Sequence, residues 1–171
     1  MKKIKFLTTG IFLMAFGAAC SSAMAKDTVD PAKFVDEASA SGVAEIEAGK
    51  LALQKSTTPA IKTFAQEVIN DHTAANKELA GIAQKKNLKV ATEAELMAKA
   101  KAMILKQRDG ESFDEAYANN QVKAHKDALE LFNKAAVSPD ADLASFAVAT
   151  IPKLEHHLHA AEALAKAYEK K

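Results

Sequence analysis

The sequence of 171 residues contains no tryptophan, one cysteine, six glycines and four prolines. A single cysteine excludes a disulfide framework and a zinc site built from several thiolates. The formal net charge of +1 excludes the strong basic field that is typical of nucleic-acid-binding domains. Hydrophobic residues, by contrast, make up 49% of the chain, which is far more than a disordered protein contains. The composition therefore predicts one globular domain, and the scarcity of glycine and proline favours helix.

The first 25 residues have the pattern of a secretory signal peptide. Three lysines, at positions 2, 3 and 5, are followed by an apolar stretch that extends to Ala19. Ala23-Met24-Ala25 then matches the small-x-small pattern of a cleavage site. The apolar stretch is shorter than the roughly 20 residues that a membrane span needs. We therefore expect residues 1–25 to be removed and residues 26–171 to form a single periplasmic domain without a transmembrane segment.

A second interpretation of this region makes Cys20 the lipid-acceptor cysteine of an outer-membrane lipoprotein. Against it, Gly17 stands where lipoprotein signals prefer a larger aliphatic residue. In both interpretations the domain is exported. Cleavage after Ala25 removes three lysines and no acidic residue, so the net charge falls from +1 to −2.

Beyond residue 30, apolar residues recur every three or four positions, which predicts helices throughout. Asp30-Pro31 and Thr58-Pro59 combine a capping residue with proline at the first helical position, and they mark two starts. Capping boxes at residues 92–95 and 112–115 mark two more starts. The predicted helices span about 31–56, 59–86, 93–109, 113–136 and 142 to near the C-terminus.

The lengths of the connections predict how these helices are arranged. Tight turns join the first two long helices and the last two, so each pair is expected to form an antiparallel hairpin. The connection between the pairs is long and includes the short helix, which is enough chain to return along the bundle. We therefore expect an all-α fold, namely an antiparallel four-helix bundle with the ferritin-like arrangement and a short crossover helix. A short connection would instead favour a simple up-and-down bundle.

Four polar residues lie in the stripes that are expected to face the interior. His72, His125 and His157 each interrupt an apolar stripe, and Glu45 interrupts a stripe of small residues in the first helix. All four lie near the middle of their helices, and the middles of antiparallel helices lie at one level. We therefore expect them to converge. Neutral imidazoles with a carboxylate suit one divalent transition metal ion.

Three further residues are expected to orient these ligands by hydrogen bonds: Asp71, Tyr117 and Asp114. Pro152 lies inside the last helix, about one turn before His157, where it frees a backbone carbonyl and kinks the axis. Two roles for this kink remain open: it opens a pocket near His157, or it only adjusts the packing of the last helix against its neighbours. The competing hypothesis for the histidines is a buried hydrogen-bond network that fixes the register of the bundle and binds no ligand.

Other candidate ligands are expected to have ordinary structural roles. His156 and His159 are expected to lie on a solvated outer face, and Met97 and Met103 are expected to fill the core. Di-iron carboxylate bundles use Glu-x-x-His motifs, but no glutamate of this sequence is followed by histidine three residues later. No phosphate-binding or nucleophile motif is present either. The sequence therefore indicates no catalytic residue.

The sequence resembles a bacterial exported family known as domain of unknown function 4142, which is classed as ferritin-like. The resemblance extends from Phe34 to about Leu164 and rests on residues 45–52, 64–65, 71–73, 76, 79, 113–114, 117, 121, 125, 132, 151–154 and 157–158. Ile151 departs from the family pattern, which favours leucine there. The resemblance implies a four-helix bundle in the periplasm or on the outer membrane, and it implies no established reaction or ligand.

Two functions follow from these expectations. In the first, the exported bundle binds a divalent metal ion or small ligand at Glu45 and the three histidines. In the second, the bundle is a structural or interaction module of the cell envelope.

Overall fold

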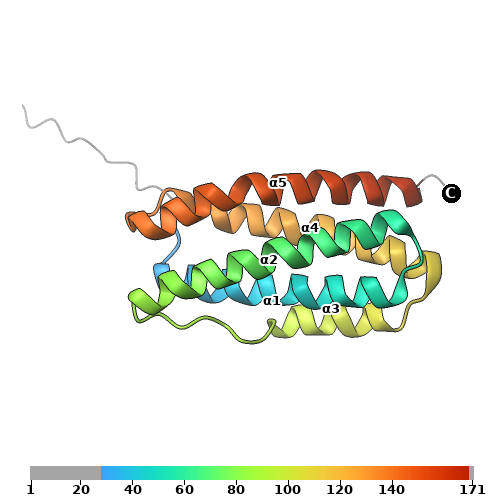
Figure 1. The fold of residues 1–171 in the computed structure, drawn as a ribbon, viewed down its shortest axis with the longest axis horizontal. Coiled ribbons are helices and arrows are strands. Elements are labelled where there is room, and N and C mark those ends of the chain that lie inside the picture. Colours follow the sequence, from blue (N-terminus) through green and yellow to red (C-terminus); the bar gives the residue numbers. More distant parts are fainter. Residues whose placement is uncertain (1–27, 170–171) are drawn as a thin grey trace, which may run out of the picture.

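The computed structural model of the chain describes residues 28–169, which form five helices and contain no strand (Figure 1). The helices are α1 (Pro31–Lys55), α2 (Pro59–Lys85), α3 (Leu96–Lys106), α4 (Gly110–Ala136) and α5 (Ala141–Glu169). The described part of the chain is therefore all-helical, as the apolar spacing predicted. None of its helices is both long enough and apolar enough to span a membrane. The expected signal peptide and Cys20 lie outside the described residues.

The first two helices begin at the prolines that the sequence analysis identified. Oδ1 of Asp30 accepts hydrogen bonds from the backbone N–H groups of Ala32 and Lys33, both at 3.0 Å, and so caps α1. Thr58 makes no such capping bond in α2, because its hydroxyl donates to Asp114 at 2.6 Å. The start of α2 therefore depends on Pro59, whose fixed φ suits the first turn.

The predicted capping box at residues 92–95 does not form, and α3 is shorter than expected. It begins at Leu96 and ends at Lys106, without a side-chain hydrogen bond at its N-terminus. Glu95, the acidic residue of that box, is the N-cap residue of α3 and makes no capping bond through its side chain, and the nearby Glu93 pairs with Lys99. The short helix therefore begins about one turn later than the local pattern indicated.

The predicted box at residues 112–115 also does not form, because α4 begins earlier, at Gly110. Ser112 therefore lies inside the helix, where its hydroxyl accepts a hydrogen bond from Arg108 at 3.0 Å. Gly110 has a φ of 55°, which is a left-handed conformation that glycine adopts without steric cost. That conformation allows the chain to turn sharply from α3 into α4.

The four long helices pack side by side as a helical bundle. Helix α1 packs against α2 and α4, helix α5 packs against α4 and α2, and α3 lies against α1 and α4. Figure 1 shows the chain running out along α1 and back along α2. It then crosses through the segment that carries α3, runs back along α4 and leaves along α5 (Figure 1).

The buried core is divided into two apolar clusters by a layer of polar residues. Phe34, Phe132 and Phe146 belong to one cluster. Phe64 and Phe113 belong to the other. The buried polar residues that lie between these clusters along the four long helices are Glu45, His72, Gln121, His125 and His157. This polar layer lies near the middle of each long helix. It therefore interrupts the apolar core at the level where the sequence analysis predicted the metal site.

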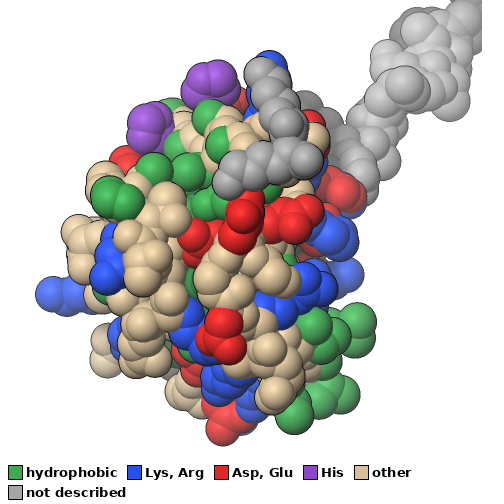
Figure 2. Space-filling view, turned by 90° about the vertical axis from the view of Figure 1, so that its right-hand side faces the viewer, with side chains coloured by type: hydrophobic (Ala, Val, Ile, Leu, Met, Phe, Trp, Pro, Cys, Tyr) green, Lys and Arg blue, Asp and Glu red, His purple; other side chains and the backbone are tan. Residues whose placement is uncertain are grey.

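Helix α3 lies at the edge of this core, to which it contributes Leu105, and it exposes large apolar side chains. Leu105 is its one buried residue, whereas Leu96, Met97, Met103 and Ile104 are between 62% and 82% exposed. The prediction that Met97 and Met103 fill the core is therefore wrong, because the short helix covers α1 and α4 from outside. Apolar side chains accordingly gather at the lower right of Figure 2, on the side of the bundle where α3 lies.

Candidate metal site

The side chains of His72, His125 and His157 meet inside the bundle. Their ring centroids are separated by 5.2 to 5.7 Å, and the three side chains are 9%, 1% and 1% exposed. One ligand nitrogen from each ring lies within 4.8 Å of the other two. Three atoms so arranged fit within about 2.8 Å of a common point, compared with about 2.0–2.1 Å for a zinc–nitrogen bond. The structure thus brings together histidines from α2, α4 and α5.

Phe64 covers this cluster on one side. Its ring centroid lies 6.4 Å from that of His125 and 6.2 Å from that of His157. Phe64 lies eight residues before His72 on α2, a little more than two turns, and the two side chains share the wide buried face of the helix at about 80° from each other. The sequence analysis did not assign Phe64 a place at the site. Its ring provides an apolar wall that keeps water away from two of the imidazoles.

The hydrogen bond of His125 determines which ring nitrogen carries the proton. Nδ1 of His125 lies 2.9 Å from the backbone carbonyl oxygen of Gln121. Because a carbonyl oxygen only accepts, Nδ1 carries the hydrogen and Nε2 keeps a free lone pair. Nε2 is buried and has no hydrogen-bond partner. The sequence analysis missed this role of Gln121, although its position four residues before His125 was the available signal.

Asp71 fixes the ring of His157 in a comparable way. Nε2 of His157 lies 3.1 Å from Oδ2 of Asp71, and Nζ of Lys153 lies 2.8 Å from Oδ1. Burial acts to raise the pKa of Asp71, but its bonds to Lys153 and His157 prevail and lower it. The ionised carboxylate therefore accepts the hydrogen of Nε2, and Nδ1 of His157 is buried without a partner.

Burial keeps all three imidazoles neutral at physiological pH. It lowers the pKa of His72 to about 3 and that of His125 to about 4, and the neighbouring histidines add to both shifts. Burial also lowers the pKa of His157, although Asp71 opposes that shift. Neutral imidazole is the form that binds metal ions. Nε2 of His72 is also buried without a partner, so each ring has one nitrogen free to act as a ligand.

A pocket of about 90 Å³ connects this cluster to the surface between α2 and α5. His72 and His157 line its inner part, and the partly exposed side chains of Asp71 and Lys153 border it. Helix α5 continues through Pro152, whose side chain is exposed, while Thr150 and Lys153 on either side line the pocket. An ion therefore has a route to two of the three rings without separation of the helices.

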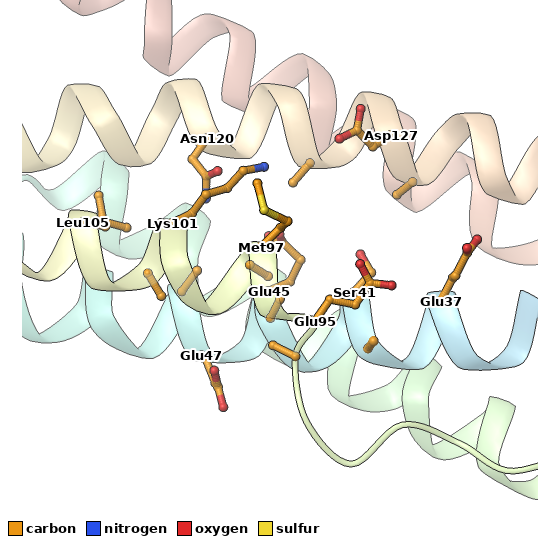
Figure 3. A pocket seen from close by; sticks show the side chains of 18 of the residues that line it. Glu37, Ser41, Glu45, Glu47, Glu95, Met97, Lys101, Leu105, Asn120 and Asp127 are labelled. Atoms are coloured by element: carbon orange, nitrogen blue, oxygen red, sulfur yellow. The ribbon is translucent and has the colours of Figure 1, made fainter. Parts of the chain in front are cut away.

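Glu45 does not join the three histidines. Its carboxylate supplies no oxygen to their group, although the side chain is only 5% exposed. Glu45 instead lines a larger cavity between α1, α3 and α4, together with Lys101 (Figure 3). Burial raises its pKa to about 7, against the opposite influence of Gln121 and Lys101. The four residues expected at one metal site are therefore divided between two places.

Of the three residues expected to orient the ligands, only Asp71 hydrogen-bonds to a histidine. Asp114 accepts hydrogen bonds from Thr58 at 2.6 Å and from Tyr168 at 3.2 Å. It lies eleven residues before His125, which is about 16 Å along the helix, so it cannot reach that ring. The hydroxyl of Tyr117 is buried without a hydrogen-bond partner, and its ring packs against Phe64 at 6.2 Å.

A second group of potential ligands lies on the outer side of His157. Glu67, Asp71 and His157 each offer an atom within 4.8 Å of the other two. In this group, however, Asp71 is already bonded to Lys153 and His157, and Glu67 lies 3.1 Å from the exposed ring of His156. The interior group is therefore the better candidate, because each of its three rings keeps one buried nitrogen without a competing partner.

The sequence of the whole chain was compared with protein families, with curated proteins and with solved structures. The family described as "Domain of unknown function (DUF4142)" matches residues 16–164, which contain the three histidines, Asp71 and Glu45. No curated protein and no solved structure matches the chain. The resemblance inferred from the sequence is confirmed, and since the match covers most of its length, the chain belongs to the family of domain of unknown function 4142.

Proposed function

We propose that this protein is an exported helical bundle that binds one divalent transition metal ion through His72, His125 and His157. Two observations carry the proposal: three buried, neutral rings offer one ligand nitrogen each within 4.8 Å of the other two, and each ring keeps one buried nitrogen without a hydrogen-bond partner. Three histidine ligands with a fourth position open to water are a known arrangement for zinc, and imidazole also suits copper and nickel. The open position allows the ion to be exchanged.

Two hydrogen bonds support this proposal because they hold rings in place before an ion arrives. The Gln121 carbonyl orients His125, and the Asp71 carboxylate orients His157. Partners of this kind fix the tautomer of a metal-binding histidine and raise its basicity. In tetrahedral coordination the ligand nitrogens lie about 3.3 Å apart. In the structure the ligand nitrogens lie no more than 4.8 Å apart. To bind a tetrahedral zinc ion, they therefore need to move closer together by at most about 1.5 Å.

The proposal includes the ferritin-like arrangement of the four long helices. This arrangement is supported by the connection between α2 and α4, which carries α3 and lets α4 run in the same direction as α2 (Figure 1). The chemistry we propose differs from that of di-iron bundles, because histidines rather than bridging carboxylates supply the ligands. We place the domain in the periplasm after cleavage behind Ala25. In the alternative, Cys20 tethers it to the outer membrane.

Metal analysis of untagged protein tests this function. We expect about one equivalent of Zn²⁺ per chain, and a tetrahedral visible spectrum when Co²⁺ replaces it. The double variant His72→Ala/His157→Ala should lose the bound ion. The matched control is His156→Ala/His159→Ala, which removes two exposed histidines of α5 and should leave the metal content unchanged. Negligible and equal metal in the wild type and the first double variant would contradict the proposal.

The second candidate function is a structural or interaction module in which the histidines form a buried hydrogen-bond network. The bonds to Asp71 and Gln121 favour it. It leaves three buried ring nitrogens without partners, and each such atom costs about 1–3 kcal/mol. This alternative predicts a large stability loss in His125→Leu and no effect of zinc on melting. Metal binding instead predicts about 2.7 kcal/mol of added stability at a zinc concentration of 100 times Kd.

A further inference from the structure

The cavity beside Glu45 is separate from the histidine cluster, and none of the three histidines lines it. It has a volume of about 340 Å³, which lies in the usual range for small-molecule sites. Much of its wall consists of alanine methyl groups from α1, α3 and α4, and Leu105 and Leu131 complete the apolar surface. The cavity can therefore hold a ligand with an apolar body.

Glu45 provides a buried carboxyl group at the wall of this cavity, where the side chain of Gln121 also acts on it. Its Oε2 atom is buried and has no hydrogen-bond partner. Figure 3 shows the side chain extending from α1 into the space between the helices, beside Met97 of α3. Leaving a buried carboxyl oxygen unpaired costs free energy. A ligand that donates a hydrogen bond to Oε2 would remove that cost.

The charges around the cavity determine the sign of the ligand that it attracts. Besides Glu45, the residues around the cavity include Glu37, Glu47, Glu95 and Asp127. Glu37 pairs with Lys33, Asp127 pairs with Lys123, and the side chain of Glu47 points away from the cavity in Figure 3, so Glu95 is the further carboxylate that faces it. One lysine opposes the two carboxylates, and Figure 3 shows the side chain of Lys101 extending from α3 past Asn120 toward α4. Glu45 and Glu95 therefore face one lysine, and this small excess of negative charge favours a cation over an anion. A fatty-acid carboxylate is therefore disfavoured, although the apolar wall alone would accept its chain.

We propose that this cavity binds a small organic cation with an apolar chain, of the alkylammonium type. Its ammonium group donates to Oε2 of Glu45, and its chain lies along the alanine wall. Entry does not require the four-helix core to open. Helix α3 forms one side of the cavity and buries only Leu105, and the exposed Met97 borders the opening.

Calorimetric titration of metal-free protein with n-hexylammonium tests the site. At pH 8 the carboxyl group of Glu45, with its pKa of about 7, is mainly ionised. We expect saturable binding of one molecule per chain, and no binding of hexanoate under the same conditions. Absence of saturable n-hexylammonium binding, or equal binding of hexanoate, would overturn the proposal.

Two variants identify the group that binds the ammonium. Glu45→Gln keeps the shape of the side chain but removes its charge, and it should weaken binding at least about tenfold, since a hydrogen bond to a charged group is lost. The matched control is Glu47→Gln, because the exposed Glu47 side chain points away from the cavity in Figure 3. It should change affinity by less than about threefold. Equal losses in the two variants would mean that the ligand binds a general acidic surface.

A third variant tests the position of the chain, and a fourth separates this site from the metal site. Ala98→Leu fills the cavity from α3 and should also weaken binding at least about tenfold. Wild-type affinity in that variant would place the ligand elsewhere and contradict the proposal. The metal-site variant His72→Ala/His157→Ala should bind n-hexylammonium as well as the wild type does, whether or not the protein binds metal.

Discussion

Nε2 of His157 donates a hydrogen bond to Oδ2 of Asp71 at 3.1 Å, across the contact between α5 and α2. The bond links a ring that is 1% exposed to a carboxylate near the surface, and Lys153 holds the other carboxylate oxygen at 2.8 Å. As a result, Nδ1 of His157 keeps its lone pair inside the protein. A carboxylate–histidine pair of this kind is a frequent partner of bound zinc.

Replacement of Asp71 should therefore weaken metal binding without removing a ligand. We expect Asp71→Ala to lower zinc affinity by about 10–100-fold, because the ring of His157 loses its orientation and part of its basicity. The control is Lys153→Ala, which removes the other partner of Asp71 and leaves the bond to His157 in place. It should change affinity by less than about threefold. Competition titration with a chromophoric chelator measures the zinc affinity of both variants. Equal affinities for Asp71→Ala and the wild type would contradict the role of Asp71 in orienting His157.

The neutral histidines should make the metal-free protein sensitive to acid. The pKa values of His72 and His125 are about 3 and 4 in the folded protein, compared with 6.5 for an unperturbed histidine. Between pH 6.5 and about 4 the unfolded chain thus binds up to two more protons than the folded one. Stability therefore falls as the pH falls, by up to about 2.7 kcal/mol per pH unit. Urea unfolding from pH 7 to 4.5 measures this slope, and His72→Leu should reduce it by about half.

Glu45 should oppose this loss of stability. Its pKa is about 7 in the folded protein and 4.5 for an unperturbed glutamate, so between these values the folded protein binds the extra proton. This contribution to stability grows as the pH falls, by up to about 1.4 kcal/mol per pH unit. Glu45→Gln removes it, so the variant should lose stability more steeply between pH 6.5 and 5 than the wild type. Parallel unfolding curves for the two proteins would show that Glu45 does not titrate there.

The depth of the histidines could be predicted from sequence, because depth along a helix depends only on residue count. Their common level follows from tight turns between helices of similar length.

The direction in which the Glu45 side chain points could not be predicted in this way. A Cβ at Gly42 would meet Asn76 of α2, so the small-residue face of α1 lies against α2. Glu45 is three residues further on, about 60° around the helix axis from Gly42. It therefore faces the cavity beside α3 and α4.

The limits of α3 and α4 depended on contacts that local patterns do not contain. Thr92 and Glu95 have the spacing of a capping box, but α3 begins only at Leu96, and Glu95 precedes it as an N-cap residue without a side-chain hydrogen bond. Asp109 was expected to lie in the last turn of the short helix, yet it forms an ion pair with Lys55 of α1 at 2.6 Å. Asp109 is the N-cap residue of α4, and its pairing with Lys55 across the bundle takes the place of a capping bond through its side chain. The long helices were predicted more accurately, because their apolar stripes extend over many turns.

Two glycine substitutions should have opposite effects on stability. A Cβ at Gly81, in α2, would meet no atom within 4 Å, so Gly81→Ala should stabilise the domain by about 0.5–1 kcal/mol through the better helix propensity of alanine. A Cβ at Gly49 would lie 2.7 Å from Cγ1 of Ile69 and 3.0 Å from the backbone oxygen of Ala65. Because that oxygen belongs to α2, α1 must move away to make room.

The cost of such overpacking is typically about 1–3 kcal/mol, which exceeds the gain in propensity. Gly49→Ala should therefore be less stable than the wild type, and Gly81→Ala should be more stable. Urea unfolding at neutral pH measures both changes on one scale. An increase in stability in both variants would mean that α1 and α2 are not in close contact at Gly49, and the small residues of α1 would then need another explanation.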